Sequence, residues 1–158
     1  MWSVRDSYWS FELSEIDAVA DRYIAAVYAK DEAAFLSLYD QDVVVFDMWD
    51  QWSYKGREAW SGMVKSWFGS LGNESVRVTF TREMCAVDDE WAVWCGIVRY
   101  AGLSAEGAEL RAMENRISWS LRRRGDRWLI VHEHSSSPAD FKTMKVSLNR
   151  DETSAQGV

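Results

Sequence analysis

The feature of this chain that most limits its fold is one change of hydrophobic period near residue 73. Before it, apolar side chains recur at the spacing of an amphipathic helix, and after it they alternate with polar ones as far as residue 136. This switch predicts an α+β protein whose second half is an antiparallel sheet. With 158 residues and 47% hydrophobic content, the chain is long enough for one domain with a substantial core.

Three helices are predicted in the first half. Ser14 is the expected N-cap of the first, because an apolar stripe at helical spacing runs from residue 16 to residue 27. Asp31 is the expected cap of a short second helix over residues 31–40, which packs back on the first. A brief β-branched strand follows at residues 43–46, and a third amphipathic helix begins after Gly56.

The second half predicts four strands, at residues 74–87, 90–102, 108–122 and 126–136, joined by short turns into a meander. Strands of this length twist and coil, so we expect a strongly curved sheet whose concave side the three helices cover only in part. The uncovered space is a cone-shaped pocket. We expect an N-terminal extension over residues 1–12, a single domain over residues 13–147 and a disordered tail over residues 148–158.

Composition argues against several classes of function. The formal charge of −7 repels phosphate backbones, and the one basic cluster, at residues 122–124, lies beside a turn, so we expect no nucleic-acid partner. Neither a signal peptide nor an apolar run of membrane-spanning length is present, which predicts a cytoplasmic protein without a membrane partner. Cys85 and Cys95 lack metal or redox spacing and are interpreted as small buried hydrophobic residues.

Three stretches carry a resemblance to a known superfamily: DEAAFLSLYDQDVVVFD at residues 31–47, KGREAW at 55–60 and WSLRRRGDRWLIVHEHSS at 119–136. Residues 13–138 resemble the superfamily of nuclear transport factor two, ketosteroid isomerase and the SnoaL-like polyketide cyclases. The resemblance implies the cone-shaped, cystatin-like fold of three N-terminal helices on a curved antiparallel sheet. It also implies a homodimer through the outer sheet face, in agreement with the large apolar residues on both faces of residues 90–102.

Asp47 is the first candidate for chemistry, because it directly follows the buried strand. The resemblance implies a carboxylate base here that removes a proton from the carbon beside a ketone. Burial among Trp49, Trp52 and Tyr54 would raise its pKa toward useful basicity. A purely structural role, in which Asp47 caps the following turn, is the open alternative.

His132 and His134 are the protein's two histidines, and strand alternation points both the same way as Trp128 and Ile130. These apolar neighbours favour an orientation into the cone. His134 is then predicted to act as an acid and base or as a donor to an oxyanion, as the scytalone dehydratase branch implies, and His132 to contact the ligand. Satisfied core histidines are the alternative. A third metal ligand is not marked by spacing, so no metal is predicted.

Tyr23 and Arg116 are weaker candidates. Tyr23 lies on the buried stripe of the first helix, where the resemblance implies an oxyanion-hole tyrosine, and a core tyrosine bonded to backbone is the alternative. Arg116 shares a strand face with Glu114, so it forms either a surface ion-pair set or a site for a ligand carboxylate. The opposite face carries Asn115, and one of the two faces must line the cone.

Two classes of function are left open. The first is a SnoaL-like pocket protein that binds a small hydrophobic carbonyl compound and acts as a cofactor-free isomerase, cyclase or dehydratase with Asp47 as base. The second is a non-catalytic small-molecule-binding or dimerisation module of the same fold. Aromatic walls favour a flat apolar ligand in either class. The predicted ligand contacts are Trp49, Trp52, Tyr54, Trp67, Trp119, His132 and Arg116.

Overall fold

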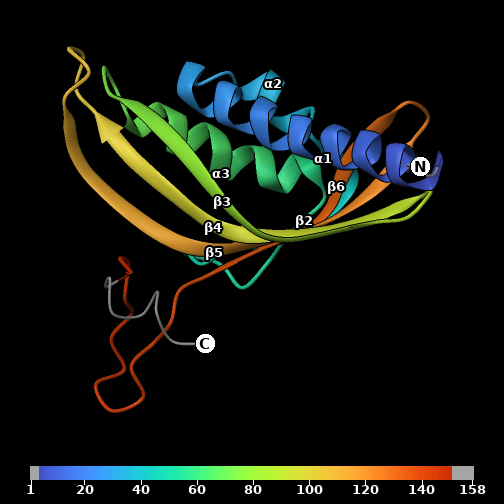
Figure 1. Ribbon diagram of the computed structural model, residues 1–158. Coiled ribbons are helices and arrows are strands. Elements are labelled where there is room, and N and C mark those ends of the chain that lie inside the picture. The colour runs from blue at the N-terminus through green and yellow to red at the C-terminus, as the bar shows by residue number, and fades with distance from the viewer. Residues whose placement is uncertain (1–3, 151–158) are drawn as a thin grey trace.

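The computed structural model describes the backbone of residues 4–150 and the side chains from residue 13 onward. Three helices lie on one side of a curved sheet in this part of the chain (Figure 1). The helices are α1 (Val4–Ala29), α2 (Glu32–Leu36) and α3 (Arg57–Ser70), and the strands are β1 (Tyr39–Phe46), β2 (Tyr54–Lys55), β3 (Ser75–Val87), β4 (Trp91–Leu103), β5 (Glu109–Arg124) and β6 (Arg127–Ser136).

The sheet has the strand order β2-β1-β6-β5-β4-β3. Strands β3 to β6 form the antiparallel meander expected from the alternating pattern. The sheet is mixed rather than wholly antiparallel, because β1 pairs with β6 in parallel. The prediction of an antiparallel sheet is therefore wrong at this edge, where the short strand β1 joins the last strand of the chain.

The first helix begins well before Ser14, so the predicted N-cap is wrong. The apolar stripe begins at Ile16 because this is where α1 starts to pack against the core, through Ile16, Val19 and Tyr23. The stripe therefore marks the buried part of the helix and not its first turn. Asp31 caps α2 as expected, accepting a bond of 2.9 Å from the Ala34 amide. This helix ends at Leu36, earlier than expected, because the chain enters β1 at Tyr39.

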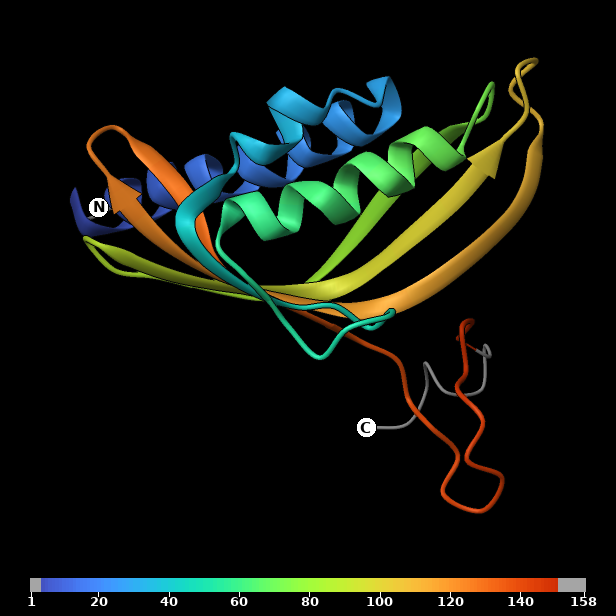
Figure 2. The same cartoon turned by 180° about the vertical axis from the view of Figure 1, so that it is seen from behind.

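The helices lie over the concave face of the sheet, as Figures 1 and 2 show from opposite sides, and the buried core residues come from both layers. At its centre, Trp94 and Trp119 stack with ring centroids 4.7 Å apart, and Phe80 packs its edge against both. The backbones of β3 and β4 approach closely here. A Cβ atom added to Gly96 would lie 2.3 Å from the carbonyl oxygen of Thr81, so only glycine fits.

After β6 the chain leaves the sheet on the side away from the helices and turns back (Figure 1). Ala139 and Val146 form an isolated bridge across this turn. The carbonyl of Leu148 then accepts a 2.6 Å bond from the amide of Glu114 on β5. Residues 148–150 of the predicted tail are therefore held against β5, and residues 151–158 lie outside the described part.

None of the helices within residues 4–150 combines the length and the apolar character that a membrane crossing requires.

Candidate functional site

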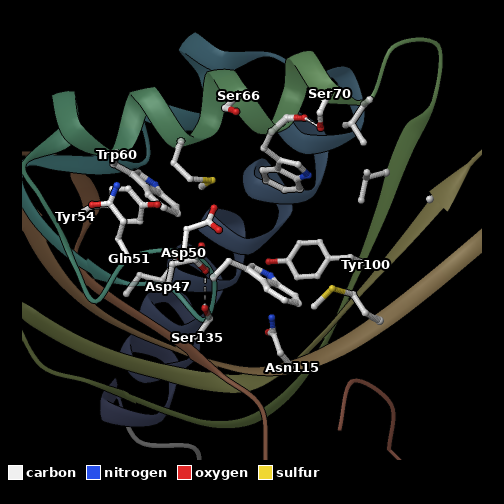
Figure 3. Close-up of a pocket in the computed structure, with 18 of the residues that line it drawn as sticks. Asp47, Asp50, Gln51, Tyr54, Trp60, Ser66, Ser70, Tyr100, Asn115 and Ser135 are labelled. Atoms are coloured by element: carbon white, nitrogen blue, oxygen red, sulfur yellow. Dashed lines mark hydrogen bonds between the residues drawn. The ribbon is translucent and has the colours of Figure 1, made fainter. Parts of the chain in front are cut away.

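A cavity of about 860 Å³ lies between α3, the loop after β1 and the concave face of the sheet. Its polar groups come from elements far apart in sequence, including the loop residues Asp47 and Asp50, Tyr100 of β4 and Asn115 of β5 (Figure 3). Aromatic side chains form much of the remaining wall. They are Tyr23, Trp49, Tyr54, Trp60, Trp67 and Tyr100.

Asp47 is held at the cavity by the end of β1. Its Oδ1 accepts bonds of 2.9 Å from the Ser135 hydroxyl and from the backbone amide of Met48. Burial raises the pKa of this carboxyl above its ordinary value, although these two hydrogen bonds lower it in part. A partly buried, oriented carboxylate with a raised pKa is a competent proton acceptor.

Glu133 is a second carboxyl at the cavity, and sequence reasoning missed it. It is buried, and its Oε2 accepts bonds from the Tyr39 hydroxyl at 2.7 Å and from the Trp119 indole N–H at 2.8 Å. Burial raises the pKa of Glu133 to about 7, with a further contribution from the charge of Asp47. Since the described residues donate no bond to Oε1, a protonated Glu133 has a donor available for a ligand.

A β-bulge explains why Glu133 points inward. Leu121 of β5 pairs with Ile130 while Ser120 pairs with His132, so Val131 has no partner across the strand. The extra residue reverses the alternation for the rest of β6. Ile130 and Glu133 therefore face the core, whereas His132 faces out.

The inward orientation predicted for the two histidines is therefore wrong. Both rings pack against Phe46, whose side chain is exposed on the outer face, and Nδ1 of His132 lies 2.7 Å from the carbonyl oxygen of Val44. Neither ring lines the cavity. The sequence did hold a signal, because the run of Leu129, Ile130 and Val131 contains more adjacent apolar residues than strict alternation allows.

Tyr23 and Tyr100 meet across the cavity wall, with 2.8 Å between their hydroxyl oxygens. Burial raises the pKa of both phenols well above the ordinary value, so both keep their protons. When Tyr23 donates to Tyr100, the proton of Tyr100 is left for a ligand. Tyr23 therefore lies at the cavity, and its hydroxyl contacts that of Tyr100.

Asn115 is 6% exposed and extends into the cavity (Figure 3). Its Nδ2 lies 3.0 Å from the sulfur of Met48. A thioether sulfur has no proton to donate, so the amide nitrogen must be the group that faces it. Its Oδ1 is then buried without a hydrogen-bond partner in the described chain.

The remaining predicted contacts divide into two groups. Trp49, Tyr54 and Trp67 line the cavity, as does Asp47. Trp52 is 97% exposed, and Trp119 is buried in the core. Arg116 lies on the exposed face of β5, opposite Asn115. The prediction that these three residues line the cavity is therefore wrong. Strand alternation had identified both faces of β5 but not which of them was inside.

Within the described residues, no group of three or more His, Cys, Asp and Glu side chains is arranged to hold a metal ion. Cys85 and Cys95 are both free. They lie on neighbouring strands, but Cys85 pairs with the inward-facing Trp94 and Cys95 pairs with the exposed Met84, so their side chains lie on opposite faces.

The model of the SnoaL-like domain matches residues 16–140, most of the chain. The protein belongs to the SnoaL-like family. None of the curated proteins matches the chain significantly.

Solved structures share the fold at low sequence identity. An NTF2-like protein of unknown function from Pseudomonas putida is 24% identical, with a TM-score of 0.73 over 87% of this chain and 94% of that one. Aln2 from a Streptomyces species is 14% identical, with a TM-score of 0.70 over 78% and 88%. A ketosteroid isomerase-like protein from Erwinia carotovora atroseptica is 19% identical, with a TM-score of 0.64 over 80% and 98%. At these identities the similarity concerns the fold alone.

Proposed function

We propose that this SnoaL-like protein binds a small apolar carbonyl compound in its cavity and catalyses a cofactor-free proton transfer, as an isomerase, cyclase or dehydratase does. One observation carries the proposal: two carboxyls with raised pKa values, Asp47 and Glu133, open on the same aromatic-walled cavity. Paired carboxyls of different protonation states are a common device for acid–base catalysis.

Asp47 is the base in this proposal. Its carboxylate takes a proton from the carbon beside the ligand carbonyl, and the electron pair of the broken C–H bond moves onto the carbonyl oxygen as an enolate. Return of the proton from Asp47 to another carbon completes an isomerisation. Attack of the enolate carbon on a second carbonyl in the same molecule, with the proton on Asp47 passing to the new alkoxide oxygen, would complete a cyclisation instead.

Glu133 and Tyr100 stabilise the enolate oxygen. With a pKa of about 7, Glu133 is protonated in a large share of the molecules at neutral pH and can donate from Oε1. Tyr100 supplies a second donor when Tyr23 donates to it. Tyr39 and Trp119 fix the Glu133 carboxyl through Oε2, so its orientation is set before a ligand binds.

Hydrogen–deuterium exchange tests the proposal. A panel of aryl ketones is incubated with the protein in D₂O, and loss of the α-proton signals is followed by NMR. We expect Asp47→Asn to lower the exchange rate by about a hundredfold or more, the scale of a general base. Asp89→Asn is the matched control, because Asp89 is exposed in the β3–β4 turn and does not line the cavity.

The non-catalytic alternative has a separate signature. Ketones that bind, as measured by calorimetry, without any α-proton exchange above the protein-free rate would contradict the acid–base proposal and identify a binding module. Equal exchange rates in the wild type and in Asp47→Asn would remove Asp47 as the base.

We also propose that two copies pack through the outer sheet face. Trp91 and Val93 of β4 are 48% and 42% exposed there, and Phe46 and Met84 lie exposed on the same face. Exposed apolar groups on the surface of a sheet favour association with a partner of similar character.

A further inference from the structure

Three carboxyls line the cavity, beside N–H and O–H donors such as the Trp60 indole, and none of the three forms an ion pair with a basic side chain within the described residues. Asp47 and Asp50 come from the loop after β1 and lie together at one side of the cavity (Figure 3). Glu133 lines the cavity from strand β6. The charge of Asp50 contributes to the raised pKa of Asp47, which agrees with their proximity.

A second, independent feature points to a ligand that donates. Asn115 is nine-tenths buried and extends into the cavity, and its Oδ1 has no donor within the described chain. Leaving a buried amide oxygen without a donor is unfavourable in a folded protein. A ligand N–H at this wall would satisfy it.

Cationic side chains do little to balance this negative charge. Arg111 is the one basic residue among the described residues that line the cavity, and its guanidinium forms an ion pair with Glu74 at the surface. The carboxylates of the cavity are therefore left to interact with whatever enters it.

The walls suit a cation as well. The faces of tryptophan and tyrosine rings attract cations because the π-electrons give each face a partial negative charge. Six such residues line the cavity, among them Trp60, Trp67 and Tyr100. An apolar body with a positive nitrogen would use both the rings and the carboxylates.

We propose that the ligand of this cavity carries a protonated amine attached to a flat apolar body, with the ammonium group between the carboxylates of the 47–50 loop and Oδ1 of Asn115. This inference names the ligand class for the cavity of the proposed function, and so rests on that proposal. Its charge preference holds whether or not proton transfer occurs.

Calorimetry with three probes of one shape tests the preference. The probes are 2-(2-naphthyl)ethylamine, 2-(2-naphthyl)ethanol and 3-(2-naphthyl)propionate, which place a cation, a neutral group and an anion on the same ring. We expect the amine to bind the wild-type protein about tenfold more tightly than the alcohol, and the carboxylate to bind most weakly. A tenfold ratio corresponds to about 1.4 kcal/mol.

Asp50→Asn isolates the charge. Asp50 has a φ of 59°, and asparagine tolerates this left-handed region as well as aspartate does, so the loop should keep its shape. We expect the variant to lower the amine-to-alcohol affinity ratio about threefold or more. Asp89→Asn should leave the ratio at its wild-type value.

Two results would overturn the inference: equal affinities for amine and alcohol in the wild type, or a ratio that Asp50→Asn does not change. Failure of the catalytic proposal is a different outcome. It would appear as absent α-proton exchange in the ketone panel, which contains no amine, whereas the probe affinities do not depend on turnover.

Discussion

The hydroxyl of Tyr39 on β1 donates a 2.7 Å hydrogen bond to Oε2 of Glu133 on β6, the same oxygen to which Trp119 of β5 donates at 2.8 Å. Three neighbouring strands thus fix one buried carboxyl. Both bonds stabilise the ionised form and partly offset the effect of burial, which leaves the pKa of Glu133 at about 7.

Tyr39→Phe should raise the pKa of Glu133 further, because it removes a donor that favours the charged carboxylate. We expect a rise of about one pKa unit, since a hydrogen bond to a charged group contributes about 1.5 kcal/mol or more. The shift can be followed by ¹³C NMR of the glutamate carboxyls. Tyr28→Phe, an exposed tyrosine of α1, is the control, and an unchanged Glu133 pKa would contradict the prediction.

Stability should depend on pH through Glu133. Its pKa rises from an ordinary 4.5 to about 7 on folding, so the folded state holds more protons than the unfolded state between these values. The free energy of unfolding therefore falls as pH rises from about 4.5 to about 7, by about 3 kcal/mol from this group. The raised pKa of Asp47 acts in the same direction.

Glu133→Gln should remove that part of the slope. Its amide oxygen still accepts from Tyr39 and Trp119, so the variant should be more stable than the wild type above pH 7 and similar to it near pH 4.5. Urea unfolding at several pH values measures the difference. Glu58→Gln, at an exposed position of α3, is the control. Parallel pH profiles for the wild type and Glu133→Gln would show the prediction to be wrong.

These properties of Glu133 could not be read from strand alternation. The pattern in β6 is regular up to Ile130, and extending it gives His132 the inward position that Glu133 holds. The direction of a side chain beyond a bulge depends on which residue is skipped, and pairing with β5 and β1 decides this. Asp47 was predictable because it directly follows a strand and does not depend on register.

Helix ends show a similar division. The Asp31 cap is local chemistry between a side chain and an amide three residues on, and it was predicted correctly. The start of α1 was not, because an apolar stripe reports where a helix contacts the core. The sequence also does not reveal how deeply each tryptophan is buried. Trp52 is at the surface, Trp67 is in the cavity wall and Trp119 is in the core.

His134→Ala should leave ligand affinity and any α-proton exchange unchanged, because its ring lies on the outer face. Tyr100→Phe is the matched change inside the cavity. Loss of its hydroxyl should lower the exchange rate about a hundredfold or more, the scale of one oxyanion donor in a buried site. NMR exchange assays of the two variants together decide the matter, and a loss in His134→Ala alone would reverse the assignment.

Gly96→Ala should destabilise the protein. The added methyl group would meet the backbone carbonyl of Thr81, which belongs to a paired strand and cannot rotate away. Forcing β3 and β4 apart should lower the free energy of unfolding by about 1–3 kcal/mol, as overpacking does. Gly69→Ala in α3 is the control, because open space surrounds its position and alanine favours helix. Equal destabilisation by both would contradict the argument.

Val93→Glu should weaken the proposed dimer. Val93 is exposed on the outer face near the start of β4, with Trp91 on the same strand, and a charge buried there between two copies would be unpaired. We expect at least a tenfold rise in the dimer dissociation constant by sedimentation velocity, with an unchanged cavity. Tyr28→Glu, on the exposed side of α1, adds the same charge away from the sheet and should leave association unaltered. A wild type that sediments as a monomer at high concentration would exclude this interface, because the apolar residues of the outer face would then be exposed to water without a partner copy.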